Sequence, residues 1–415
     1  MSSNDELSEW FRICRIALMA LLPCLAVMAG AAEPAAPAPP PAIVAANNTF
    51  GYHLYAALAK ADATQNVFIS PVSIEYCLAM VANGAQGDTY AQLAQTLGWG
   101  AMTRDEVNAG FQALTNRLLT ADPKVQLSLA DSLWLNSKTT FHPAFTDANT
   151  KYFQAELQTV NFTDPATVPA INGWVNKKTQ GMIPTLLGKG DVDNKTLLVL
   201  LNALYFKGIW TAPFDAKLTT DQPFTLADGT EQTVKMMERS DKISYCEDAL
   251  LQMARLPYGD GHLNMVVILP KDGVTLSAAA QQVFTTQNWS TYMGQLRPRQ
   301  GTLSLPRFAA HYAVDLPATL KALGITDAFT AKADFSGICD MASYINQVKH
   351  KTALEVNEEG TKAAAVTSVG MRTLAMHRPL PPFVMTINHP FLLALQNEDG
   401  ALLFLGQIVK PEALK

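Results

Sequence analysis

Residues 358–382 read EEGTKAAAVTSVGMRTLAMHRPLPP, and the interpretation of the whole chain turns on this stretch. It follows TALEV at 352–356, which belongs to a predicted strand. From Thr361 to Thr367 the residues are small or β-branched, with one charge at Lys362. The simplest interpretation is a long surface loop before a proline turn, but a loop of this length inside a compact domain is usually functional. Its small side chains would also suit a segment that enters a crowded sheet as an extra strand.

The rest of the chain predicts a domain that mixes helices and strands. Apolar residues recur at helical spacing over 48–61 and 73–83. The run TLLVLLNALYF at 196–206 fits a strand buried on both faces or a buried helix, and its aromatic end favours the strand. Further strands are predicted at 67–71, 124–136, 263–270, 301–308, 352–360, 383–395 and 401–409. Helices early and strands later favour an α+β fold with largely antiparallel sheets.

Composition excludes several classes of protein. The 415 residues are 48% hydrophobic and 16% charged, with a net charge of −5. The chain is long enough for a large core and too apolar to be disordered. Because a nucleic-acid-binding protein normally carries a basic face, the acidic balance predicts no nucleic-acid partner.

The N-terminal segment predicts export. Arg12 and Arg15 precede an uncharged run at 16–29, and small residues follow it, as they do before a signal-peptidase site. The run is shorter than the ~20 residues that a spanning helix needs, and Pro23 interrupts it. A cleaved signal peptide is therefore favoured over a retained membrane anchor.

Three parts are expected along the chain. Residues 1–32 form the signal peptide, and EPAAPAPPPAIVAA at 33–46 forms a Pro/Ala-rich linker of extended conformation. Residues 47–415 form a single domain. The expected localisation is secreted or periplasmic.

Motifs of enzymes and metal sites are not found in the sequence. G-x-S-x-G, HExxH, P-loop and G-x-G-x-x-G patterns are absent, and Cys77, Cys246 and Cys339 show neither close pairs nor CxxC spacing. We predict no catalytic residue, no metal site and no cofactor, and a protein that is not an enzyme. A hydrolase on an unrelated fold stays an alternative, because a catalytic triad can be scattered along a sequence.

Four segments, in the same order as in the family, resemble the serpins, the serine protease inhibitor family. EEGTKAAAVT at 358–367 is similar to the family's reactive-loop hinge, and NVFISPVSIEYCLAMVANGAQGDTYAQL at 66–93 to its early helix–strand core. LNALYFKGIW at 201–210 resembles a central-sheet strand, and NHPFLLAL at 388–395 with the final LFLGQIVKP resembles the C-terminal hairpin. The resemblance runs from about residue 47 to 412. It implies the α+β serpin fold, with three β-sheets, eight or nine helices and an exposed reactive-centre loop at about 358–382.

The resemblance also implies a mechanism. A target serine protease attacks a bond in the loop and forms its acyl-enzyme, and the cleaved loop inserts into the large sheet and traps it. The protein would thus be a suicide substrate, and the style of its N-terminal segment suggests a bacterial-type, secreted member. A non-inhibitory serpin-like binding or chaperone protein is the alternative. We expect a monomer, and no heparin-type polyanion as partner, because Arg104 and Arg117 are the only bases in 86–120.

The loop residues take their roles from the family pattern. Leu374–Ala375 is the favoured reactive bond, with Arg372, Met371 and Met376 as alternatives. Leu suits a chymotrypsin-like or elastase-like protease, Met an elastase-like one and Arg a trypsin-like one. No proline or large residue is expected to obstruct insertion, and Lys362 is expected to face solvent. The hinge comprises Glu358, Glu359, Gly360, Thr361, Lys362, Ala363, Ala364, Ala365, Val366 and Thr367.

A second set of residues is expected beneath the large sheet. Ser70, Ser73, Asn202 and His350 match the family's "shutter", a polar cluster that sets how easily the sheet opens. Trp210 matches the "breach", where the loop begins to enter. The alternatives are ordinary helix capping by the two serines, a solvent-exposed His350 and a core Trp210.

Overall fold

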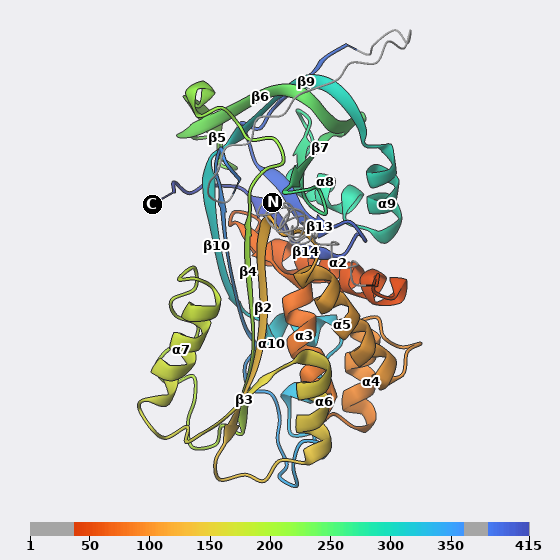
Figure 1. Ribbon diagram of the computed structural model, residues 1–415, viewed down its shortest axis with the longest axis vertical. Coiled ribbons are helices and arrows are strands. Elements are labelled where there is room, and N and C mark those ends of the chain that lie inside the picture. Colours follow the sequence, from red (N-terminus) through yellow and green to blue (C-terminus); the bar gives the residue numbers. More distant parts are fainter. Residues whose placement is uncertain (1–36, 361–380, 415) are drawn as a thin grey trace, which may run out of the picture. The chain divides into compact units, whose positions relative to one another are not determined.

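The structure, a computed structural model, describes residues 37–360 and 381–414. Within these ranges the chain forms nine α-helices and three sheets, which confirms the predicted α+β fold class. In Figure 1 the long strands β2, β4 and β10 stand between α7 on one side and α3 to α6 on the other. The helices are α2 (Pro41–Ala61), α3 (Pro71–Ala82), α4 (Gly87–Thr96), α5 (Arg104–Leu119), α6 (Pro143–Phe153), α7 (Thr167–Lys178), α8 (Leu276–Val283), α9 (Thr286–Gln295) and α10 (Pro317–Leu323).

The largest sheet has nine strands and contains the C-terminal hairpin. Every residue of its central strands β8, β13 and β14 is buried, as expected for strands covered on both faces. Its strand order is β1-β14-β13-β8-β7-β6-β9-β12, with β5 on β6. The bounds are β1 (Val67–Ile69), β5 (Thr220–Thr225), β6 (Glu231–Glu247), β7 (Leu251–Tyr258), β8 (Leu263–Pro270), β9 (Arg297–Pro306), β12 (Phe383–Thr386), β13 (Phe391–Asn397) and β14 (Leu402–Ile408).

Two smaller sheets carry the candidate site. One has the order β3-β2-β4, with β2 (Val125–Asn136), β3 (Glu156–Val160) and β4 (Leu198–Gly208). The other pairs β10 (Phe308–Asp315) with β11 (Lys349–Val356). Among the described residues β4 forms a ladder with β2 alone and β11 with β10 alone. An isolated bridge between Ile209 and Gly360 joins the ends of β4 and β11, so these two strands are the facing edges of one divided sheet.

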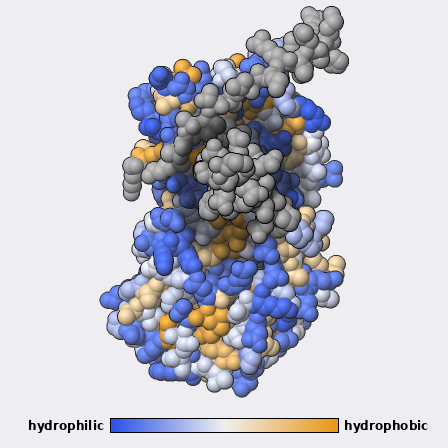
Figure 2. Space-filling view, viewed as in Figure 1, coloured by the Kyte–Doolittle hydropathy of each residue, from blue (hydrophilic) through white to orange (hydrophobic). Residues whose placement is uncertain are grey.

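The ladder β2–β4 is covered on both faces. Leu198, Leu200 and Leu204 pack on the main core, which also contains α3. Val199 and Leu201 pack instead in a second core with α7. Figure 2 shows a largely hydrophilic face, with hydrophobic side chains gathered in its lower half between the positions of α7 and α6 in Figure 1. The double coverage explains why the run at 196–206 is apolar at almost every position, and the open choice between strand and buried helix is resolved as strand β4.

The start of the domain differs from the prediction. Helix α2 begins at Pro41, so residues 41–46 of the predicted linker are helical. Pro41 is tolerated because the first helical position needs no N–H donor, and Ile43 is fully buried against Gly110. The high proline content predicted an extended spacer. Proline also occurs at the first position of a helix, and the prediction did not consider this alternative. No described helix has both the length and the apolar composition needed to cross a membrane.

Candidate functional site

The hinge leaves β11 through a tight turn that is attached to the end of β4. Asn357 and Gly360 exchange backbone hydrogen bonds, with N···O distances of 3.1 and 3.2 Å. The N–H of Trp210 donates to the carbonyl oxygen of Glu359 at 2.9 Å, and that of Phe214 to the carbonyl oxygen of Glu358 at 2.8 Å. At Gly360 the chain has therefore already turned back relative to the direction of β11. Backbone hydrogen bonds from the segment after β4 hold this turn in place.

Only glycine fits at position 360. Gly360 has a φ of +113°, where a residue with a Cβ is strained. A Cβ there would lie 2.4 Å from the Gly208 oxygen and 2.5 Å from the Trp210 nitrogen. Both are backbone atoms that cannot turn aside, so this glycine permits the close approach of hinge and strand.

Glu358 attaches the hinge to the body of the protein through two side-chain contacts. Its side chain is 12% exposed, and its Oε1 accepts a hydrogen bond from Thr219 Oγ1 at 2.8 Å. The guanidinium of Arg307 lies 3.5 Å from the same oxygen. A buried carboxylate is tolerated only when it is paired in this way, so the first hinge glutamate is a structural tie as well as a motif residue.

Trp210 lies directly against the hinge and within the core. It is 2% exposed and stacks on Tyr258, with ring centroids 4.2 Å apart and planes 16° from parallel. Its Nε1–H donates to the Asn357 carbonyl oxygen at 2.9 Å. The core and breach interpretations of this tryptophan therefore describe the same geometry.

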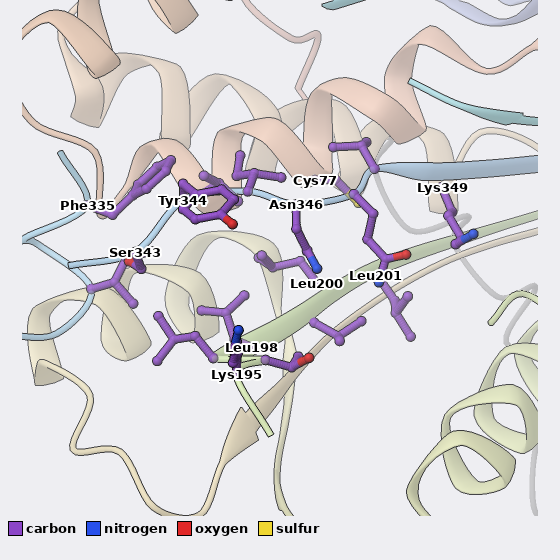
Figure 3. A pocket seen from close by; sticks show the side chains of 18 of the residues that line it. Cys77, Lys195, Leu198, Leu200, Leu201, Phe335, Ser343, Tyr344, Asn346 and Lys349 are labelled. Carbon is purple, nitrogen blue, oxygen red and sulfur yellow. The ribbon is translucent and has the colours of Figure 1, made fainter. Parts of the chain in front are cut away.

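Two cavities lie beside β4, between it and the chain that leads into and begins β11. The larger, ≈ 390 Å³, is lined by Cys77 and Leu78 of α3, by β4 from Leu198 to Leu201, and by the segment from Met341 to Lys349. Figure 3 shows the side chains that line it, among them Tyr344 and Asn346 from the segment before β11. The smaller, ≈ 30 Å³, is lined by residues of the same three parts of the fold. The space between the two strand edges is thus incompletely filled.

The structure brings the four predicted shutter residues together. Ser73, Asn202 and His350 line the smaller cavity. The backbone N–H of Ser70 donates to His350 Nε2 at 3.1 Å, and Ser70 Oγ accepts from the Ser73 N–H at 3.3 Å. The second contact caps α3, so helix capping and clustering occur together. His350 is buried, not solvent-exposed, and burial lowers its pKa to about 3, so it is neutral at physiological pH.

Asn202 has a partner that sequence reasoning missed. Its Nδ2 donates to Asp131 Oδ1 at 2.8 Å, across a pair of residues in register on β2 and β4. Asn202 Oδ1 is buried and has no hydrogen-bond partner among the described residues. Asp131 interrupts the apolar strand LSLADSLWL, and that interruption was the available signal.

Several predicted residues lie outside the described part of the chain. They are Thr361 to Thr367 of the hinge, the bond Leu374–Ala375 and the alternatives Arg372, Met371 and Met376. Within 37–360 and 381–414, no group of three or more His, Cys, Asp or Glu residues is arranged to hold a metal ion.

Comparison with known proteins decides the family. The family profile Serpin (serine protease inhibitor) matches residues 45–411. This chain belongs to the serpin family. It is 37% identical to Serpin B8 of Bos taurus over 379 residues, covering 89% of this chain and 100% of the relative, and 37% identical to the leukocyte elastase inhibitor of Homo sapiens, covering 88% and 99%.

Solved structures agree with the fold of this serpin. Tengpin, a thermophilic serpin in the native state, superposes with a TM-score of 0.79 at 30% identity, over 88% of this chain and 94% of its own. Thyroxine-binding globulin in complex with thyroxine superposes with a TM-score of 0.79 at 26% identity, over 89% and 100%. The predicted serpin fold is confirmed.

The relatives contradict the predicted export. The family match begins at residue 45, and Serpin B8 and the leukocyte elastase inhibitor are covered over 99–100% of their own lengths. They therefore have no counterpart of residues 1–32, on which the prediction of a signal peptide and of a secreted or periplasmic protein depended. That prediction is not retained. The same mammalian relatives give no support for a bacterial-type member.

Proposed function

We propose that this serpin inhibits a serine protease as a suicide substrate, by inserting its cleaved reactive loop between β4 and β11. The observation that carries the proposal is the pair of facing strand edges above two cavities. The loop leaves β11 through a turn that already touches the end of β4 at Ile209. An inserted strand would run antiparallel to both neighbours, because β4 and β11 both end at this turn.

The bridges at the turn define a register for insertion. Continuing the Asn357–Gly360 pair along β11 would place Thr361 opposite Val356 and Thr367 opposite His350. Continuing the Ile209–Gly360 pair along β4 would place Thr367 opposite Asn202. Two independent ladders thus lead the same hydroxyl to the shutter, where Asn202 Oδ1 is a buried acceptor without a donor among the described residues. This agreement supports insertion between these two strands.

The register also explains the small side chains of the hinge. On β11 the buried positions are His350, Thr352, Leu354 and Val356. The loop residues opposite them, Thr361, Ala363, Ala365 and Thr367, would face the core, since paired residues share a side of a sheet. Lys362 would face outward, between Lys207 and Glu355. The one charged residue of the segment therefore falls on the face that tolerates a charge.

Insertion would release a large free energy. A strand of this length adds about ten net hydrogen bonds at ~1 kcal/mol each, comparable with the whole stability of an ordinary domain. The native state is then metastable and persists because a kinetic barrier separates it from the inserted form. The shutter cluster at His350 and the breach contacts of Trp210 are the interactions that would set this barrier.

The relatives favour an elastase-like target. The names leukocyte elastase inhibitor and serpin (serine protease inhibitor) support a serine protease as partner and a protein that is not itself an enzyme. An elastase-like primary pocket is apolar, so Leu374 is preferred as the residue before the cut, with Met371 or Met376 next and Arg372 last. A monomer that binds neither nucleic acid nor a heparin-type polyanion stays a prediction. A non-inhibitory binding or chaperone protein is the second candidate.

Mixing the protein with an elastase-like, a chymotrypsin-like and a trypsin-like protease tests the proposal. Denaturing gels should show an SDS-stable adduct, and mass spectrometry should detect a released C-terminal peptide that begins at Ala375. A peptide with another N-terminus would move the reactive bond and leave the mechanism intact. Cleavage of the loop without an adduct for any of the three proteases would reject inhibition and favour the non-inhibitory candidate.

A further inference from the structure

Two carboxyl groups are buried in this part of the fold, one on α3 and one on the ladder β2–β4. Glu75 on α3 is 0% exposed, and neither of its oxygens has a hydrogen-bond partner among the described residues. Asp131 on β2 is 4% exposed and accepts one hydrogen bond, from Asn202. An ionised carboxylate needs several donors or a cation when it is removed from water. The geometry therefore requires Glu75 to be protonated and makes the ionised form of Asp131 costly.

The titratable neighbours supply no positive charge. Burial raises the pKa of both Tyr76 and Cys77, which follow Glu75 on α3, so both are neutral near pH 7. On α2, which packs on α3, burial likewise raises the pKa of Tyr52 and Tyr55. Burial lowers the pKa of His350 on β11 to about 3.

Four cations of the other packed elements make their contacts elsewhere. Arg117 of α5 binds Glu398 and Asp399, at 2.5 and 2.8 Å. Glu156 of β3 binds Lys178 of α7 at 2.5 Å. On α5, Arg104 donates to the carbonyl oxygens of Asn83 and Ala85, beyond the C-terminal end of α3. On α6, Lys151 is exposed and donates to Tyr152. None of these cations reaches the two carboxyls.

We propose that Asp131 forms a proton-operated latch, in which its protonated carboxyl lets the β2–β4 ladder pack on the core and its ionisation loosens that packing and eases the separation of β4 from β11. Asp131 can respond near neutral pH, because it is a buried residue of the ladder itself. Its one hydrogen-bond partner, Asn202, lies on the strand edge that must move. Lifting the ladder admits water to the carboxylate, so ionisation and opening favour each other. The proposal rests on the proposed function only in treating this separation as the step that admits the loop.

The sign of the effect follows from proton binding. Burial raises the pKa of Asp131 to about 7, whereas an unfolded aspartate titrates near 3.9. The folded state therefore holds a proton that the unfolded chain releases, and this stabilisation, complete below about pH 3.9, is lost as the pH rises through about 7. Between pH 6 and pH 8 the Asp131 contribution raises the unfolding equilibrium constant about tenfold.

His350 acts in the opposite sense and must be separated from this effect. Its folded-state pKa lies below the unfolded value, so its contribution is present above about pH 6.5 and is lost as the pH falls toward about 3. A pH profile of the unmodified protein alone mixes the two groups. The ratio of unfolding constants between the unmodified protein and Asp131→Asn isolates Asp131, because asparagine does not titrate.

The experiment compares urea unfolding, followed by circular dichroism without protease, at pH 6 and pH 8. The ratio of unfolding constants, unmodified over Asp131→Asn, should rise about tenfold between the two pH values. Asp122→Asn is the matched control, because Asp122 is also buried but accepts backbone N–H bonds from Lys124 and Asp260, at 2.9 and 2.6 Å. Its ratio should not rise. An Asp131→Asn ratio that stays constant would overturn the latch.

Local opening is measured on the unmodified protein, so the test survives if a variant does not fold. Hydrogen exchange of the β4 amides, corrected for the intrinsic effect of pH, should quicken from pH 6 to pH 8 relative to those of β8. Equal corrected exchange at both pH values would contradict a latch on β4. Since no protease is present, either failure leaves the inhibitory function untouched.

Discussion

Gly360 brings the backbone of the hinge close to the backbone at the end of β4. Gly360→Ala would meet both a strained φ and the backbone of Gly208 and Trp210. We expect a loss of more than about 1 kcal/mol in the free energy of unfolding, measured by urea denaturation. Gly229→Ala is the control, because Gly229 has a φ of +82° with open space around it. Equal losses in the two variants would show that the contact with β4 has no energetic role.

Short motifs predicted individual residues of the candidate site but not the residues that form hydrogen bonds with them. Ser70, Ser73, Asn202 and His350 were identifiable from short motifs, and the structure places the last three around one cavity and Ser70 in hydrogen-bond contact with His350 and Ser73. Asp131 was not, because its contact with Asn202 joins positions 71 residues apart. The tie between Glu358 and Thr219 is equally non-local, spanning 139 residues. Such contacts depend on the pairing of strands, which local patterns do not determine.

The proposed register predicts that a large charged side chain is tolerated at position 362 of the loop but not at position 361. Thr361→Arg would place a long cation toward the core opposite Val356, whereas Lys362→Arg keeps a cation on the outer face. We expect Thr361→Arg to turn the inhibitor into a substrate that is cleaved without an adduct, and Lys362→Arg to inhibit normally. Adduct yield on denaturing gels measures both. Full inhibition by Thr361→Arg would refute the register, and equal loss in both variants would refute the assignment of faces.

Strands were easier to predict than their order. The alternating run at 124–136 and the apolar run at 263–270 became β2 and β8 with nearly the expected bounds. The predicted strand at 383–395 is two strands, β12 and β13, because the chain between them leaves one partner strand for another. The division between β4 and β11 had no local signal, since an unpaired strand edge has the same composition as a paired one.

Considered as a whole, this serpin stores free energy in a sheet that is one strand short. The central strands of the nine-stranded sheet are paired and buried, whereas the edge of β4 borders a cavity of ≈ 390 Å³ between it and the segment that leads into β11. In the sequence, the only sign of this arrangement is the high hydrophobic fraction of 48%. Which strands stay apart depends on the complete fold, and the same fold places the hinge turn at Gly360 beside the end of β4.

Hydrogen exchange before and after cleavage tests directly whether the loop inserts between β4 and β11. The protein is cut in the loop by its target-class protease, and deuterium uptake is read by mass spectrometry over β4 and β11, with β8 as an internal reference. Insertion predicts that the amides on the facing edges of β4 and β11 become strongly protected after cleavage, while those of β8 do not change. Unchanged exchange on both edges in the cleaved protein would mean that the loop does not enter this gap, and would contradict the account.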